Sequence, residues 1–377
     1  MKHHLVVAFT ALAAAGAPSL ALAEIQPETL TVQPRISEGG HVYVMDFGIN
    51  DSSRIVVLDA DDLGLQGTIG AGTFAQMRMN ADRKTLFTSS AYFSRYSYGD
   101  VEAVVHEWDP ATLARKREFT ISNKMVQGLS QRGVLNVSAD GNFLVVQNAT
   151  PATSVTIASL AEGKDIAEIP TPGCWTAYPS AKGTAFTAIC GDGTLAKYGY
   201  AADGSFSQGA KSDKIFDADT DPLFGDALRV GDNLVYVSYG GTLHVVDDSG
   251  DRPVLVRKVD FAEDGWAVSG YNLMAYHEPS GTLFVLMHDQ PFDGSHKVPA
   301  KEIWAIDMKT DKVVGRSSAQ GVSNITVSAD ADPVLFGLDH MGGVHRFDVT
   351  LGDKVTLEQT AATEGVAAFP TMLVTDF

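Results

Sequence analysis

The stretch Ile55-Val-Val-Leu-Asp59 is an apolar run that ends in an acid and leads into a turn. Six later stretches repeat this pattern of an apolar run, an acidic or small polar residue and a turn. They are Val105-His-Glu-Trp-Asp109, Val155-Thr-Ile-Ala-Ser159, Leu195-Ala-Lys-Tyr-Gly199, Leu243-His-Val-Val-Asp247, Ile303-Trp-Ala-Ile-Asp307 and Val344-His-Arg-Phe-Asp348. Spacings of about 40–50 residues with about four short strands per unit are typical of β-propeller blades. The sequence therefore predicts an all-β fold, a seven-bladed β-propeller.

A second element alternates with the first and consists of a turn that leads into an apolar strand. Its copies are Asn80–Phe87, Ser138–Val145, Pro279–Val285 and the looser Ser328–Phe336. Asp, Asn and Gly accept the backbone angles of tight turns, so each copy predicts a hairpin. A doubly wound α/β fold would need amphipathic runs of ten or more residues, which are absent from the sequence. Independent β-sandwich domains remain the alternative. The repeat lacks the GH and WD pairs of WD40 blades, so the predicted propeller is not of the WD40 type.

The composition excludes several classes of protein. With 377 residues, 45% hydrophobic and 20% charged, the chain is too apolar for a disordered protein. Its 36 glycines follow no period of three and it contains no heptads, which excludes collagen and long coiled coils. The net charge of −18 repels phosphate backbones and anionic lipids, so we expect neither nucleic-acid nor membrane-surface binding. The acidic excess would attract a cationic substrate or a basic partner, or it serves solubility alone.

The first residues predict export. Lys2 precedes a nearly continuous apolar run from Leu5 to Leu20, which ends in Ala21-Leu22-Ala23. These are the three regions of a secretory signal peptide. We therefore predict a signal peptide (1–23), an N-terminal arm (24–40) and one propeller domain (41–377), with a periplasmic location. No later run of 18 residues is apolar, so the mature chain is expected to be soluble.

Two cysteines, Cys174 and Cys190, remain in the exported chain. Export favours a disulfide between them. The alternatives are a free thiol or a cofactor crosslinked to Trp175, although neighbours in sequence are poorly placed to join a ring to a sulfur atom.

Motifs for catalysis and metal binding are sparse. The chain has no G-x-S-x-G, H-E-x-x-H, Walker or haem-attachment motif. His277, His288 and His296 lie close in sequence without the spacing of a metal site, and an ordinary polar loop is the preferred interpretation. One segment contains four acids, Asp217, Asp219, Asp221 and Asp226. Their spacing is not that of a calcium-binding loop, so a solvated acidic loop is the preferred interpretation. We predict no catalytic or metal-binding residue on this chain.

The run Tyr92-Phe-Ser-Arg-Tyr-Ser-Tyr98 gathers aromatic side chains around one arginine. The serines of this run and the glycine that follows it, Gly99, favour a loop, and loop aromatics beside an arginine are typical of protein interfaces. Tyr92, Phe93, Arg95 and Tyr96 are therefore candidate interface residues, with packing inside a blade as the alternative.

Several segments resemble the heavy subunit of the quinoprotein amine dehydrogenases, more closely the aromatic (aralkyl) than the methylamine enzymes. Two long stretches are the most specific: Val146-Gln-Asn-Ala-Thr-Pro-Ala-Thr-Ser154 and Ser295-His-Lys-Val-Pro-Ala-Lys-Glu-Ile-Trp304. Six shorter stretches support them: His41-Val-Tyr-Val-Met-Asp46, Val126-Gln-Gly-Leu129, Gly173-Cys-Trp175, Ile189-Cys-Gly-Asp-Gly193, Gly270-Tyr-Asn-Leu273 and Asp307-Met-Lys-Thr310. The resemblance extends from about Gly39 to Phe347 and places Cys174 and Cys190 at the heavy-chain disulfide of the family.

This resemblance implies a heterotetramer of two heavy and two light chains. In such enzymes the light chain carries a tryptophan tryptophylquinone cofactor and the catalytic base, and the heavy chain carries no cofactor. Primary amines are oxidised to aldehydes and ammonia, and the electrons pass to a small blue copper protein of the azurin or amicyanin type. The family also has a channel phenylalanine shortly after the strand that corresponds to 41–46. Phe47 is a phenylalanine as in the family, whereas Ile49 lies at the family's position when residues are counted from the end of the strand. Both are therefore candidates for the substrate-channel wall.

Two other functions remain open from the sequence. One is a stand-alone propeller enzyme, such as a lactonase-like hydrolase or a quinohaemoprotein, which would need its own metal or cofactor. The other is a binding scaffold without a dehydrogenase partner. A gene for a short, cysteine-rich exported chain beside this one would favour the heavy subunit over both.

Overall fold

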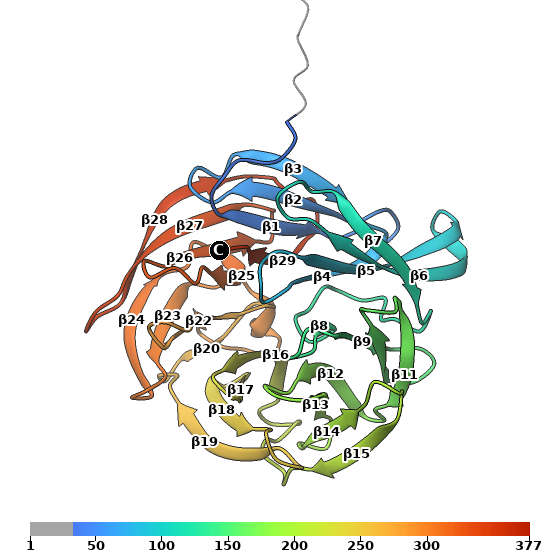
Figure 1. The fold of residues 1–377 in the computed structure, drawn as a ribbon. Coiled ribbons are helices and arrows are strands. Elements are labelled where there is room, and N and C mark those ends of the chain that lie inside the picture. The colour runs from blue at the N-terminus through green and yellow to red at the C-terminus, as the bar shows by residue number, and fades with distance from the viewer. Residues whose placement is uncertain (1–32) are drawn as a thin grey trace, which may run out of the picture. The chain divides into compact units, whose positions relative to one another are not determined.

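The repeats of the sequence form seven antiparallel sheets arranged in a ring (Figure 1). The computed structural model describes residues 33–377, so the predicted signal peptide and residues 24–32 of the predicted arm lie outside the described residues. The unit Arg35–Phe377 holds all seven sheets. The prediction of a seven-bladed β-propeller is confirmed.

The strands run in chain order from the centre of each blade to its rim, except in the first blade, where the innermost strand comes last in the chain. Blade 1 contains β29 (Pro370–Thr375), β1 (His41–Asp46), β2 (Arg54–Asp59) and β3 (Leu65–Gly70); blade 2 contains β4 (Thr73–Met79), β5 (Leu86–Arg95), β6 (Tyr98–Trp108) and β7 (Arg115–Ile121); blade 3 contains β8 (Leu135–Val137), β9 (Phe143–Asn148), β10 (Ser154–Ser159) and β11 (Lys164–Pro170). Blade 4 contains β12 (Cys174–Pro179), β13 (Ala185–Cys190), β14 (Leu195–Tyr200) and β15 (Phe206–Lys211); blade 5 contains β16 (Leu223–Val230), β17 (Asn233–Ser238), β18 (Thr242–Asp247) and β19 (Val254–Asp260). Blade 6 contains β20 (Trp266–Val268), β21 (Met274–His277), β22 (Thr282–Asp289), β23 (Glu302–Asp307) and β24 (Lys312–Ser318), with the 3₁₀ helix η1 (Ser295–Lys297) between β22 and β23; blade 7 contains β25 (Val322–Val327), β26 (Val334–Asp339), β27 (Val344–Thr350) and β28 (Thr356–Thr363).

The repeated sequence elements correspond to the two middle strands of the blades. Each of the seven apolar runs lies in the third strand of a blade, and each turn-plus-strand element enters the second strand. These strands are packed between neighbouring strands and between neighbouring blades, so β9 and β10 are buried along their whole length. Strands covered on both faces are nearly continuous apolar runs, whereas the rim strand β15 is largely exposed. The burial of the middle strands therefore explains why the repeat is visible in the sequence.

The ring is closed by strands from the two ends of the described chain. β29 pairs with β1 in antiparallel register, with Met372 opposite Met45. Phe377 then packs against Phe336, with ring centroids 6.2 Å apart. The first blade thus takes its innermost strand from the C-terminal segment, an arrangement that the sequence repeat does not predict.

Candidate functional site

The antiparallel topology divides the connections of the ring between two faces. Within every blade the turn between the second and third strands lies on the same face as the connection to the next blade. We call this the loop face; the other turns form the turn face. The loop face carries the longest connections, residues 122–134, 212–222 and 290–301. Binding residues of proteins are commonly held on such loops by a rigid scaffold.

Exposed apolar side chains are concentrated on the loop face. Of the thirteen large apolar side chains that are exposed in residues 33–377, eight lie on connections or strand ends of this face, and a ninth, Tyr271, lies between β20 and β21, where its amide bonds to Ser323 at the start of β25. The nine are Ile49, Tyr92, Tyr96, Tyr98, Leu129, Tyr271, Phe292, Met341 and Phe369. The other four, Leu65, Phe206, Val254 and Val256, belong to outer strands. The loop face is therefore the candidate protein-binding surface of the ring.

The β5–β6 hairpin carries the largest exposed aromatic cluster of the loop face. The predicted loop is instead a continuation of both strands, with a turn at Tyr96 and Ser97. Tyr96 is 75% exposed, and Arg95 lies over the ring of Tyr98 at 5.6 Å. Phe93 is half-buried against the core between blades 2 and 3. The hairpin therefore presents its tyrosines and Arg95 outward and uses Phe93 to hold its base.

The two channel candidates occupy different environments. Phe47 is only 4% exposed and packs at ring-centroid distances of 6.0 Å from Phe74 and 6.1 Å from Phe369. Ile49 is 45% exposed. The loop between them is fixed by hydrogen bonds from the hydroxyl of Thr73 to the carbonyls of Gly48 and Ile49. Phe47 thus anchors the base of this loop, and Ile49 is its outward side chain, while the partly exposed Phe369 packs against Phe47 from the connection between β28 and β29.

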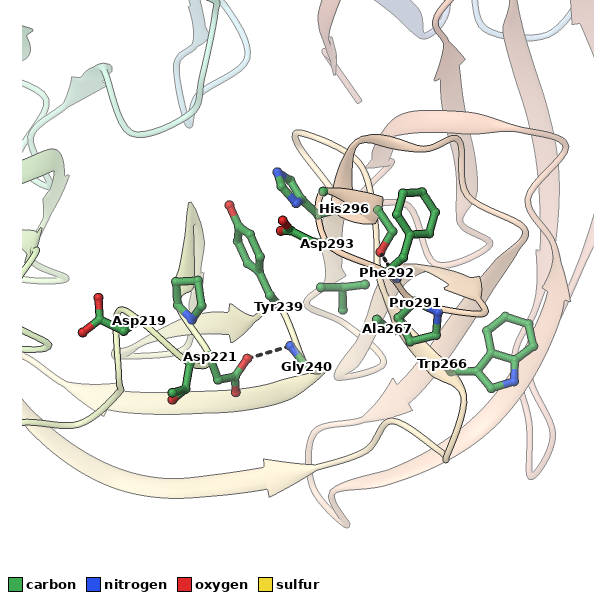
Figure 2. A pocket seen from close by; sticks show the side chains of 15 residues that line it. Asp219, Asp221, Tyr239, Gly240, Trp266, Ala267, Pro291, Phe292, Asp293 and His296 are labelled. Carbon is green, nitrogen blue, oxygen red and sulfur yellow. Dashed lines mark hydrogen bonds between the residues drawn. The ribbon is translucent and has the colours of Figure 1, made fainter.

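A cavity of about 650 Å³ opens beside the 290–301 connection (Figure 2). Its wall combines acids with aromatic residues: Asp219, Asp221, Asp293, Tyr239, Phe292 and His296. The rings of Tyr239 and His296 lie 4.4 Å apart, and Asp221 accepts a hydrogen bond of 2.7 Å from the amide of Gly240. Burial and the nearby Lys297 lower the pKa of His296. The lowered pKa favours the neutral form of the imidazole, so the three aspartates are the acidic groups of a cavity without a nearby cationic histidine.

The histidines and acids considered from the sequence do not form one group: Asp219, Asp221 and His296 line the loop-face cavity, and the others lie outside it. His277 interacts with the Ser280 hydroxyl and the Asp330 carbonyl at 2.8 Å each, whereas His296 belongs to the loop-face cavity. Residues 33–377 contain no group of three or more histidine, cysteine or acidic side chains placed to hold a metal ion. Asp217 caps its own turn through hydrogen bonds from the amides of Asp219 and Thr220, and Asp226 lies apart from it in the centre of the ring.

The two cysteines form the predicted disulfide. Cys174 and Cys190 are opposite each other on β12 and β13, at the loop-face end of blade 4, and their sulfur atoms are bonded. The indole nitrogen of Trp175 is 3.5 Å from Oε1 of Gln131, away from the disulfide. The disulfide thus joins two neighbouring strands where the chain enters and leaves the loop face.

The most extensive buried polar contact was not expected from the sequence. Arg132 reaches across the centre of the ring from the 122–134 connection to the innermost strands of three other blades. Its guanidinium lies 3.1 Å from Oδ2 of Asp226, and it donates to the carbonyls of Met274 at 2.6 Å and Ile325 at 2.7 Å. Burial raises the pKa of Asp226 to about 6, although Arg132 opposes this shift. No local motif marks these residues, because the ring brings them together from distant segments.

Comparison with known proteins identifies the family. The model of the methylamine dehydrogenase heavy chain family matches residues 38–375, so the chain belongs to this family. The methylamine dehydrogenase heavy chain of Methylophilus methylotrophus is 25% identical over 326 residues, 84% of this chain and 79% of the relative. That of Methylorubrum extorquens is 26% identical over 315 residues, 81% of this chain and 76% of the relative.

Solved structures support the fold alone. A proposed 6-phosphogluconolactonase from Bacteroides fragilis aligns with a TM-score of 0.62 at 11% identity, covering 92% of this chain and 99% of the other. Dihydro-haem d1 dehydrogenase aligns with a TM-score of 0.53 at 15% identity, covering 93% of this chain and 79% of the other. Among the described residues, no helix has the length and apolar character needed to cross a membrane.

Proposed function

We propose that this chain is the non-catalytic heavy subunit of a periplasmic amine dehydrogenase and that its loop face binds the light chain. The observation that carries this proposal is the concentration of exposed apolar side chains on one face of a member of a heavy-chain family. Large aromatic side chains supply most of the binding energy at protein interfaces. Tyr92, Tyr96 and Arg95 on the β5–β6 hairpin are proposed contacts, with Phe93 holding the hairpin from below.

The light chain would carry the tryptophan tryptophylquinone cofactor, which accepts electrons from the amine substrate. Residues of the heavy chain would contribute to the wall of the substrate channel. Ile49 is the proposed outward-facing contact, and Phe47 fixes the loop that presents it, because Phe47 is packed between Phe74 and Phe369. An apolar wall of this kind suits aromatic amines, which are the proposed substrates.

Electrostatics supports the approach of an ammonium substrate. The net charge is −18, and Asp219, Asp221 and Asp293 line the cavity on the loop face. A negative surface raises the local concentration of cations and accelerates their association at low ionic strength. Aldehyde and ammonia would be the products, and a small blue copper protein would receive the electrons. The complex would contain two heavy and two light chains.

The experiment that tests the proposal is a pull-down of the tagged mature chain from the periplasm of its host, grown on an aromatic amine. The eluate is examined for a small second subunit, for quinone absorbance and for oxidation of phenylethylamine with a dye acceptor. A small subunit with quinone absorbance and activity supports the proposal, and activity with methylamine alone revises the substrate class. A single 40 kDa band overturns the heavy-subunit role.

A further inference from the structure

The centre of the ring contains a second cavity, on the turn face. Its volume is about 340 Å³, within the usual range for small-molecule sites. Three arginines line it, Arg78, Arg132 and Arg229. Polar residues from the inner ends of the blades, Asn80, Ser138 and Ser180, complete its wall. The contacts of Arg132 with Asp226, Met274 and Ile325 lie at the inner end of this cavity.

The three guanidinium groups are not equally compensated. Arg132 pairs with Asp226, and Nη1 of Arg229 lies 2.7 Å from Oδ1 of the fully buried Asp248. Within residues 33–377 the structure gives the side chain of Arg78 neither an ion pair nor a hydrogen bond. Arg78 is partly buried in the wall of the cavity, and this desolvation, together with the positive charge of Arg132, lowers its pKa. The cavity therefore contains one positive charge in excess of its nearby carboxylates.

This excess is unusual in so acidic a chain. The sequence has 46 acidic and 28 basic residues, yet none of the carboxylates in residues 33–377 forms an ion pair with Arg78. Even partial burial of an uncompensated charge is costly, because protein atoms replace some of the water that would solvate it. A guanidinium group offers its donors in a planar fork that matches the geometry of carboxylates and phosphates. A small anion in the cavity would supply the missing partner.

We propose that the turn-face cavity is a binding site for one small oxyanion, a phosphate or a carboxylate, held mainly by Arg78. Arg132 and Arg229 strengthen the positive field there while remaining paired with their own carboxylates. Asn80 and Ser138 add neutral polar groups to the wall. The site lies on the face opposite the proposed light-chain surface, so its occupancy is independent of the proposed function.

The test is calorimetric titration of the purified mature chain with inorganic phosphate and, separately, with succinate in 100 mM sodium chloride. We expect saturable binding of one anion per chain. The Arg78→Gln variant should bind at least tenfold more weakly, because the free guanidinium is gone. Tighter binding of phosphate than of succinate assigns a phosphorylated ligand, and the reverse assigns a carboxylate. The absence of saturable binding for both anions overturns the proposal.

Arg252→Gln is the matched control. Arg252 also lies on the turn face, but it is an exposed partner of Asp213 at 3.2 Å, outside the cavity. Its removal should leave anion affinity unchanged. If Arg252→Gln and Arg78→Gln weaken binding equally, the loss comes from the lower positive charge of the protein in general, and the proposed site is overturned. Arg78→Lys keeps the charge without the fork and should bind at least threefold more weakly than the wild-type chain. An unchanged affinity in Arg78→Lys would remove the forked contact from the proposal.

Thermal denaturation provides a second readout that also checks folding. A ligand that binds the native state raises the melting temperature. Phosphate or succinate should therefore stabilise the wild-type chain and Arg252→Gln but not Arg78→Gln. Without an anion, Arg78→Gln should melt no lower than the wild-type chain, since it removes an uncompensated charge. Equal stabilisation of all three chains would overturn the site.

Discussion

The two faces of the ring differ in how their connections are built. The turns of the turn face are short, six residues or fewer, as in residues 80–85, and many are fixed by an aspartate that accepts hydrogen bonds from following amides. The loop face carries connections of up to thirteen residues, 122–134, and eight exposed apolar side chains. The short turns of the turn face thus serve the fold, whereas the loop face exposes apolar surface that folding alone does not require.

The largest expected effect is a loss of light-chain affinity, which tests the difference between the loop face and the turn face. The double variant Tyr96→Ala/Phe292→Ala removes two strongly exposed rings from the loop face, 75% and 65% exposed. If both are interface hot spots of about 2 kcal/mol each, affinity for the light chain falls about a thousandfold. Binding is measured by titration with the isolated light chain.

Leu65→Ala/Phe206→Ala is its matched control, because both side chains are exposed on outer strands near the turn face, at 68% and 47%. This control should bind as the wild-type chain does. Equal losses in the two double variants would mean that the loop face has no special role.

The next effect concerns the contact that joins the blades at the centre. Arg132→Met leaves Asp226 buried without its cationic partner, and removal of one member of a buried pair costs about 3 kcal/mol. Urea denaturation should show this loss of unfolding free energy. Arg252→Met removes an exposed pair and should change stability by less than about 0.5 kcal/mol. Similar small changes in both variants would contradict a central role for Arg132.

The disulfide is expected to matter for stability alone. Cys174→Ala/Cys190→Ala removes a crosslink between residues separated by 16 positions, and we expect a loss of about 2 kcal/mol. Thermal denaturation under oxidising conditions measures it, and an unchanged melting temperature would contradict this role. Light-chain affinity should stay unchanged. A loss of affinity would instead show that the disulfide shapes the loop face beside it.

The smallest expected effect is a change in stability on loss of an ion pair on the loop face. A hydrogen bond from Lys211 at 2.7 Å, together with one from Thr194, lowers the pKa of Asp192 to about 2. Its stabilising contribution is therefore present above about pH 4 and is lost as the pH falls toward 2. Because both side chains are about half exposed, Lys211→Met should cost less than about 0.5 kcal/mol at pH 7.

Carboxyl carbon NMR would follow the Asp192 pKa in this variant. A pKa that stays near 2 without Lys211 would assign the shift to the turn itself rather than to the ion pair.

The sequence predicts the two middle strands of the blades well and the loop face only in part. The middle strands are buried on both sides, so their apolar runs recur visibly, as in Ile303–Asp307. On the loop face, only the Tyr92–Tyr98 run has a local signature. Phe292 and Met341 are single apolar residues in irregular segments, and Phe369 ends a short apolar run; their exposure depends on the direction in which each connection leaves its blade.

The centre of the ring is the part that sequence reasoning misses entirely. Arg132, Asp226 and Ile325 are separated by about a hundred residues from one to the next, and their contact requires the closed ring. The family resemblance is confirmed for the heavy-chain family as a whole. The preference for aromatic amines stays a prediction, because substrate selection rests on a few side chains rather than on the fold.

Closure of the ring by β29 has a consequence for biosynthesis. Because residues 370–375 supply the innermost strand of the first blade, β1 keeps an unpaired edge until the final segment has been made. An unpaired edge can join another chain and begin aggregation. The nascent chain therefore passes through a stage in which the ring is open and the edge of β1 is unpaired. Termination before Pro370 would leave the chain permanently in this aggregation-prone state.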